Sequence, residues 1–361
     1  YNVGYLVKSQ KICKDFEEAA TVALEAGNDM FMATPEFYEG CLNAIKSGKL
    51  DIKYVDEACE RILRMKFKLG LFEDDRMPDA SKIVMRTQHA LDTNLRAARE
   101  SLILLKNREN FLPLDPSKLK KIAVLGPNAD HPLSMNGDWS AGTNQTKDCP
   151  PPPRENAKTV LDGVKNNFKN GEVLYCRGAS IEPGETSDFA TALKYANDSD
   201  VVVVVVGDRE CYWGEEKSTC TLELMGDQID FLNKIVETGK PFILDIISSK
   251  PLVIPANIRN NASAIIQQFS PGQMGGQAFA DVIFGLYNPS GRLTISIPYH
   301  VGQQPIFYNV TRGCHQDRYA DMTFEPCWPF GFGLTYSNII YESAKLNKEK
   351  FNNDNNEVLE C

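Results

Sequence analysis

The sequence has few of the features that would assign it to a redox, metal-binding or nucleic-acid-binding class. None of its ten cysteines forms a CxxC pair, which argues against zinc knuckles and thioredoxin-like redox motifs. Its four histidines have no metal-ligand spacing, so we expect no metal and no cofactor. No basic run occurs and the formal net charge is −9, which excludes nucleic acids and anionic membranes as expected partners.

The sequence also contains no long apolar run and no N-terminal signal peptide. The longest valine run, Val201–Val206, is far too short to span a membrane. The chain begins with Tyr1 and no signal peptide precedes it, so we expect either a removed leader or a piece of a longer protein. No GxGxxG opens a helix after the first strand of the α/β region, which disfavours a nucleotide-binding protein.

The cysteines and the glycosylation triplets bear on the compartment. Four sequons with an even cysteine count favour a secreted, disulfide-permitting route, the alternative being a cytosolic protein with buried free thiols. Cys211 with Cys220, and Cys314 with Cys327, are candidate pairs, although spacing leaves the connectivity open. The predicted glycosylation sites are Asn144, Asn197, Asn261 and Asn309.

The second part of the chain alternates apolar strands with amphipathic helices. Strands apolar throughout, separated by helices, are typical of a mostly parallel sheet covered on both faces, so we predict an α/β fold. Ligands gather at the carboxyl ends of such strands. The predicted strands are "LILLKN", "KIAVLG", "GEVLYC", "VVVVVVG", "PFILDIISS" and "ASAIIQQFS".

The first 75 residues have a different pattern. Helical spacing occurs over residues 16–26, 36–50 and 51–72, and "DMFMATP" at 29–35 predicts a short strand and loop. There is no room here for a complete sheet. The polar, proline-bearing stretch 73–87 is a predicted linker.

An acidic loop follows the valine strand, at the predicted ligand edge of the sheet. It contains Glu210, Glu215 and Glu216 among the aromatic residues Tyr212 and Trp213. Two readings are open for this loop: a solvated acidic turn, or a site in which carboxylates act beside aromatic rings.

Several segments together resemble glycoside hydrolase family 3, most closely its plant-type β-xylosidase / α-L-arabinofuranosidase branch. The likeness spans Tyr1 to Ser337, and the segments occur in the family's order. The segments are "EEAATVALEAGNDM", "RMKFKLGLF", "ARESLILLKN" with "FLPL", "KIAVLGPNAD", "FSPGQMGGQAFADVIFGLYNPSGRL" and "PCWPFGFGLTYS".

The resemblance implies a domain organisation. Residues 1–75 are expected to be the last strand and helices of a (β/α)8 barrel, and residues 76–96 a linker. Residues 97–335 are expected to form an α/β sandwich domain, and residues 336–361 the start of a fibronectin type III-like domain or a tail.

The resemblance also implies a retaining exo-acting β-glycosidase of the β-xylosidase or β-glucosidase type. Such enzymes use two carboxyl groups about 5–5.5 Å apart, a nucleophile and a general acid/base. In the family pattern the acid/base falls on Glu215, with Glu216 the adjacent alternative and Glu210 a more distant one. Tyr212 and Trp213 are expected to stack on a sugar or exclude water. Trp139 is a further candidate for substrate binding, or for packing between domains.

Two departures from the family pattern qualify this expectation. Ser218 and Thr219 stand where the family has an Asp-Arg pair, and Trp213 replaces the first of two Glu residues. The nucleophilic Asp of the family falls just before Tyr1, and neither Asp15 nor Asp29 aligns with it. A glycoside-cleaving enzyme would therefore need an N-terminal barrel part as partner. The alternative is a non-catalytic, carbohydrate-binding or structural subunit of an extracellular assembly.

Other residues at the predicted ligand edge have ordinary explanations. Asn128 and Asp130 suit a turn after a strand. The glycines Gly272, Gly275 and Gly276 precede a helix; a phosphate cradle is conceivable there, but close backbone packing is the favoured role because no Walker lysine is present.

Overall fold

The computed structural model describes residues 2–74, 76–309, 319–338, 340 and 342–346. The chain divides into two compact units, Tyr1–Met85 and Arg86–Cys361.

The first unit consists of helices joined by loops. Asp15 and Asp51 cap two of the helices, each accepting a hydrogen bond from a backbone N–H of the first turn. A small core joins Leu24, Ala44 and Leu50. The helices are α1 (Asn2–Lys8), α2 (Phe16–Glu25), α3 (Glu36–Lys46) and α4 (Ile52–Lys68).

The predicted strand at 29–35 is wrong. These residues form coil and turns between α2 and α3, and Met30 and Met32 are 80% and 70% exposed. A parallel strand exists only where neighbouring strands accept and donate its backbone hydrogen bonds. The described residues of this unit contain no such neighbour.

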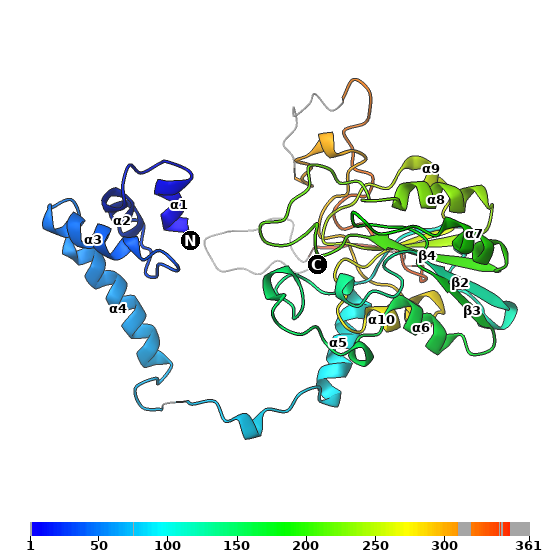
Figure 1. Ribbon diagram of the computed structural model, residues 1–361, viewed down its shortest axis with the longest axis horizontal. Helices are drawn as coiled ribbons and strands as arrows, with labels where there is room; N and C mark the ends of the chain where they lie inside the picture. Colours follow the sequence, from blue (N-terminus) through cyan, green and yellow to red (C-terminus); the bar gives the residue numbers. More distant parts are fainter. Residues whose placement is uncertain (1, 75, 310–318, 339, 341, 347–361) are drawn as a thin grey trace. The chain divides into compact units, whose positions relative to one another are not determined.

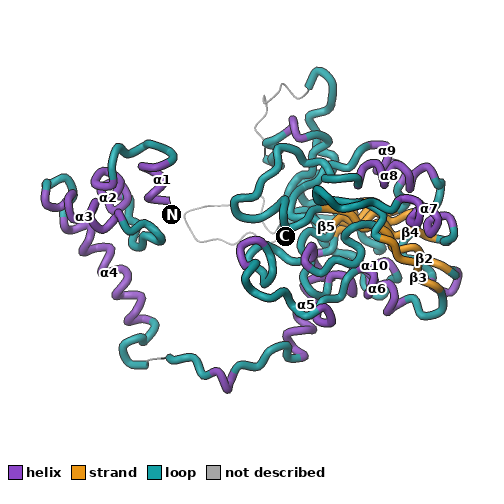
Figure 2. Tube along the Cα trace, in the orientation of Figure 1, coloured by secondary structure: helices purple, strands orange, loops and turns teal. Residues whose placement is uncertain are grey.

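The second unit is built on a six-stranded sheet with the order β1-β6-β5-β4-β2-β3 (Figure 2). Neighbouring strands from β6 to β3 are parallel, and β1 pairs antiparallel with β6 at the edge. The predicted mostly parallel sheet is thus confirmed. The strands are β1 (Ile103–Asn107), β2 (Lys121–Leu125), β3 (Glu172–Cys176), β4 (Val201–Gly207), β5 (Phe242–Ile247) and β6 (Ala264–Gln267).

Helices cover both faces of this sheet (Figure 1). On one face lie α7 (Phe189–Asn197), α8 (Gln228–Glu237) and α9 (Ala256–Asn261). On the other lie α6 (Val160–Asn167) and α10 (Gly275–Ile283), with α5 (Gln88–Ser101) packed on α10. Because α5 begins at Gln88, it covers the second half of the stretch 76–96. Short 3₁₀ turns lie in the loops at Ala80–Lys82, Arg108–Asn110, Pro116–Lys118, Leu133–Met135, Asn144–Thr146, Arg154–Asn156 and Val301–Gln303.

The two layers of helices explain the valine run of β4. Val202, Val204 and Val206 pack into the core beneath α7, α8 and α9. The alternate valines pack into the core beneath α6 and α10. A strand buried on both faces has no polar position, which is why its sequence does not alternate.

Close backbone packing accounts for the glycine-rich entry to α10. A Cβ atom on Gly276 would lie 1.9 Å from the carbonyl oxygen of Thr159, and one on Gly163 would lie 1.9 Å from the carbonyl oxygen of Gly276. These glycines therefore let α6 and α10 approach each other. Close backbone packing was the role favoured from the sequence.

The winding of the sheet reverses between β2 and β4. From β2 the chain crosses to β3 on one side, and from β4 it continues through β5 to β6 on the other. In doubly wound sheets the crevice for a ligand forms at this switch point, outside the carboxyl ends of the two strands. The residues of a ligand site are therefore expected in the loops that follow β2 and β4.

Candidate active site

Glu215 lies in the loop that follows β4, and its side chain is exposed. Its backbone N–H donates to Asp138 Oδ2 at 2.7 Å, and its backbone carbonyl accepts from Gln145 Nε2 at 2.8 Å. The indole Nε1 of Trp139 donates to Glu215 Oε2 at 3.1 Å. Backbone and carboxylate of this one residue are thus both held.

All three partners of Glu215 come from the loop that follows β2. The two loops that flank the switch point therefore meet, and they meet at Glu215. The structure brings Trp139 and Glu215 together as a pair, although the sequence separates them by 76 residues. Trp139 is 63% exposed, so most of its ring remains open to solvent.

The backbone near the contact has unusual conformations. Trp139 has a φ of 63° and Glu216 a φ of 62°, both in the left-handed region that bulky residues seldom adopt. Such conformations persist only where surrounding contacts over-determine them, and they cluster at binding sites.

The other two aromatic candidates, Tyr212 and Trp213, are more buried than Trp139. Trp213 is only 4% exposed, so its ring is enclosed by protein and offers no open face to a sugar in this structure. Tyr212 is half-buried, and its hydroxyl lies 3.5 Å from the carbonyl oxygen of Ile181. Of the alternative carboxylates, Glu216 is exposed and Glu210 half-buried.

A buried carboxylate lies at the start of the same loop. Asp208 directly follows β4 and is 1% exposed. Burial raises its pKa from 3.8 to about 6, because the charged form loses its hydration, while the Lys250 ammonium 3.5 Å from Oδ2 acts in the opposite direction.

The turn residues after β2 have structural partners. Asn128 is fully buried, and its Nδ2 donates to the carbonyl oxygen of Asp208 at 3.2 Å. Asp130 accepts from Thr159 Oγ1 at 2.9 Å and forms an ion pair with Arg154. These contacts tie the two ligand-edge loops to the sheet and to α6.

The candidate disulfide across the acidic loop is absent. Cys211 and Cys220 are both free thiols, as is Cys327, whereas Cys314 lies outside the described residues. The loop is held by hydrogen bonds to Asp138 and Gln145 instead of a covalent bridge.

Three of the predicted glycosylation sites have described side chains. Asn197, Asn261 and Asn309 are exposed. The side chain of Asn144 lies outside the description, although its backbone begins a 3₁₀ turn.

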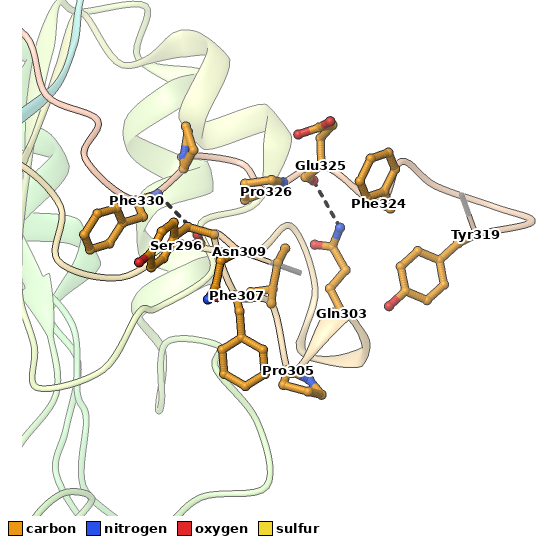
Figure 3. Close-up of a pocket in the computed structure, with 13 residues that line it drawn as sticks. Ser296, Gln303, Pro305, Phe307, Asn309, Tyr319, Phe324, Glu325, Pro326 and Phe330 are labelled. Atoms are coloured by element: carbon orange, nitrogen blue, oxygen red, sulfur yellow. Dashed lines mark hydrogen bonds between the residues drawn. The ribbon is translucent and has the colours of Figure 1, made fainter. Parts of the chain in front are cut away.

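A cavity of about 720 Å³ lies among the segments 296–309 and 319–330, and of the predicted site residues it is lined only by the predicted glycosylation site Asn309 (Figure 3). Phe307, Phe324 and Phe330 form part of its wall. Two of its polar side chains hold the wall itself: Gln303 bonds to four backbone groups, and Ser296 Oγ accepts from the N–H of Phe330. The lining is mixed, because the exposed Glu325 belongs to it beside the phenylalanines.

The described residues form neither a metal-binding cluster nor a membrane-spanning helix. No group of three or more His, Cys, Asp or Glu side chains there is arranged to hold a metal ion. No helix among these residues is both long and apolar enough to cross a membrane.

The fold and the site define a class: a doubly wound α/β domain with an exposed glutamate fixed at its switch point. Residues 102–336 match the sequence profile of the glycosyl hydrolase family 3 C-terminal domain, and the chain belongs to this family.

Relatives and solved structures agree with this assignment. A β-xylosidase of Formosa agariphila is 36% identical over 96% of this chain and 48% of its own length. A periplasmic β-glucosidase of Salmonella typhimurium is 33% identical over 94% of this chain and 48% of its length. The structure of a β-glucosidase involved in saponin metabolism from intestinal bacteria superposes with a TM-score of 0.87 at 38% identity, covering 98% of this chain and 52% of that one.

The family resemblance inferred from the sequence is therefore confirmed. The chain spans about half the length of the curated relatives it matches.

Sequence reasoning missed several residues of the site, among them Gln145 and Lys250. Gln145 has no sequence signal, because its role depends on how the loop after β2 folds back. Lys250 had a sequence signal, because it follows β5 at the carboxyl edge of a parallel sheet, where ligand-facing loops are expected.

Proposed function

We propose that this chain is the C-terminal part of a retaining, exo-acting β-glycosidase, and that Glu215 is its general acid/base. The observation that carries the proposal is the exposed Glu215 carboxylate at the switch point, with its backbone and one carboxylate oxygen held by the loop after β2. Relatives named β-xylosidase and β-glucosidase support terminal β-linked xylose or glucose as the substrate class.

In the proposed mechanism Glu215 protonates the glycosidic oxygen as the aglycone leaves. It then removes a proton from the water that hydrolyses the glycosyl-enzyme intermediate. Trp139 orients the carboxylate through its indole N–H, and its exposed ring is available to a sugar face. Tyr212 belongs to the same loop, and the buried Trp213 anchors that loop.

The nucleophilic Asp is proposed to come from an N-terminal barrel part outside this chain. In support, the unit Tyr1–Met85 exposes many large apolar side chains, which fits the last helices of a barrel that the rest of the barrel covers. We also propose residues 76–96 as the connection and 97–335 as the sandwich domain. The start of a fibronectin type III-like domain, proposed from residue 336, falls largely outside the described residues.

We further propose that the protein is secreted and glycosylated. The exposed Asn197, Asn261 and Asn309 support this. Treatment of protein from a eukaryotic host with peptide N-glycosidase should reduce its mass; an unchanged mass would contradict this point alone.

The experiment on function uses the intact protein, with its N-terminal part, and 4-nitrophenyl β-D-xyloside and β-D-glucoside. Replacing Glu215 by Gln keeps the shape of the side chain but removes the proton donor. Turnover should fall about 10²–10⁴-fold, the usual contribution of general acid–base catalysis. The matched control is Glu216→Gln, at the adjacent exposed glutamate. Its turnover should fall less than about threefold.

A second variant separates the two steps of the reaction. In Glu215→Ala the intermediate accumulates, because water then lacks a general base, whereas azide needs none. Azide should therefore restore turnover and give a β-glycosyl azide. Full activity of Glu215→Gln would refute the assignment. Sugar binding without turnover by the unmodified intact protein would favour the non-catalytic alternative.

A further inference from the structure

Lys250 reaches the loop of Glu215 from the neighbouring strand. It follows β5, and its side chain is 21% exposed. Its own backbone carbonyl accepts hydrogen bonds from Ser248 Oγ at 2.7 Å and from the N–H of Leu252 at 2.9 Å. The lysine therefore starts from a fixed main chain, and its ammonium group extends toward the loop between β4 and α8.

The ammonium group contacts three separate points of that loop. Nζ donates to Thr219 Oγ1 at 2.9 Å and to the backbone carbonyl of Tyr212 at 3.2 Å, and it lies 3.5 Å from Asp208 Oδ2. An ammonium group has three donors and no acceptor, and two of them are used in hydrogen bonds to the loop, while the Asp208 carboxylate contributes an ion pair.

These contacts bracket Glu215 in the chain. Asp208 and Tyr212 precede it and Thr219 follows it, so one cation joins the two arms of the loop. The loop after β2 holds Glu215 from the other side, through Asp138 and Gln145.

The charge balance of the loop supports the same role. The acidic loop holds Ser218 and Thr219 where the family pattern has an Asp-Arg pair, so position 219 itself carries no charge. The Thr219 hydroxyl at that position accepts the hydrogen bond from Lys250. Lys250, which follows β5, thus brings a positive charge to this position, and it also forms an ion pair with the buried Asp208 carboxylate.

We propose that Lys250 is a positioning residue for Glu215: it holds the two arms of the acid/base loop together and does not itself touch the substrate. The inference rests on the proposed function. A general acid must lie within hydrogen-bond reach of the leaving oxygen, and a misplacement of about 1 Å lowers the rate about 10²-fold.

The test compares two substrates of the intact enzyme, because only one of them needs a proton donor. Xylobiose (or cellobiose, if the enzyme prefers glucose) has a poor leaving group, whereas the 2,4-dinitrophenyl β-glycoside leaves without protonation. The ratio kcat/KM reports the first, acid-assisted step. Lys250→Met should lower kcat/KM about 10–100-fold for the disaccharide and less than about threefold for the aryl glycoside.

Three further variants control this result. Lys250→Arg keeps the charge and should restore most of the lost disaccharide activity. Thr219→Val removes one hydrogen-bond acceptor of Lys250. It should lower kcat/KM for the disaccharide relative to the aryl glycoside, but by less than Lys250→Met does. Lys234→Met removes an exposed lysine of α8 that pairs with Glu237, and should leave both substrates unchanged. Equal losses on both substrates in Lys250→Met, or none, would overturn the inference.

Hydrogen exchange gives a readout that does not depend on turnover. In the intact protein, Lys250→Met should speed amide exchange across residues 209–220 about tenfold and leave β4 unchanged, because only the loop is released. Unchanged exchange in the loop would contradict the inference.

The two proposals fail in different ways. An active Glu215→Gln enzyme refutes the proposed function, while loop exchange still decides whether Lys250 orders the loop. A strong Glu215→Gln defect together with an unchanged substrate ratio in Lys250→Met refutes the role of Lys250 alone.

Discussion

Gly214, the residue before Glu215, shows how narrowly the site is specified at the residue scale. Its φ of +106° lies in a region that residues with side chains rarely adopt. A Cβ atom there would lie 2.6 Å from Asp138 Oδ2, the oxygen that accepts the hydrogen bond from the N–H of Glu215. Glycine at this position therefore lets the two ligand-edge loops approach each other.

The variant Gly214→Ala is expected to impair both stability and activity. The backbone strain should cost about 1–3 kcal/mol in the free energy of unfolding, measured by urea denaturation. Displacement of Asp138 should also free the Glu215 backbone and lower turnover of the disaccharide at least tenfold.

The matched control is Gly137→Ala in the facing loop. A Cβ atom on Gly137 would meet nothing within 4 Å, so this variant should behave like the unmodified protein. Equal behaviour of the two alanine variants would contradict the packing argument for Gly214.

At the scale of the element, β4 illustrates why a run of valines needs two covering layers. Val203 and Val204 are neighbours, both fully buried, yet their side chains enter different cores. In a sheet with one wet face, one of the two would contact water.

Threonine has nearly the shape of valine, so substitution tests burial without creating a cavity. Val203→Thr and Val204→Thr should each lower the free energy of unfolding by about 1–3 kcal/mol, because each buries a hydroxyl group. Leu286→Thr, at a site 66% exposed, should change it by less than about 0.5 kcal/mol. Tolerance of either valine substitution would mean that one face of the sheet is not covered.

The sequence predicted most elements because their patterns are local. Helix α8 carries its buried residues Phe231, Leu232 and Ile235 at helical spacing, and β5 is apolar except for Asp245. The strand predicted at 29–35 was wrong because strands require partners, which a local pattern does not supply.

At the scale of the whole molecule, exposed apolar side chains are concentrated in the first unit. Met30, Met32 and Phe67 are among its large side chains that face solvent, while its buried core is small. Apolar surface on this scale marks an interaction site. The proposed occupant is the remainder of a barrel.

We therefore expect this chain alone to bind the apolar dye ANS and to self-associate, whereas the intact protein should do neither. The double variant Met30→Ser/Met32→Ser should reduce dye binding by the chain alone. Leu286→Ser, an isolated exposed leucine of the second unit, is the control and should not. Fluorescence titration with sedimentation velocity measures both effects. Equal dye binding by chain and intact protein would exclude a covering barrel part.

The sequence by itself determined the α/β class, most elements of the second unit and the family, because hydrophobic periodicity and ordered motifs are properties of adjacent residues. It also marked the loop of Glu215 as a candidate. Only the tertiary structure decided which residues meet there. Trp139 reaches Glu215, Trp213 is buried, Cys211 and Cys220 stay free, and Lys250 reaches the loop from the segment after β5. Such contacts join residues far apart in the chain, and they depend on strand order and loop conformation, which no local pattern encodes.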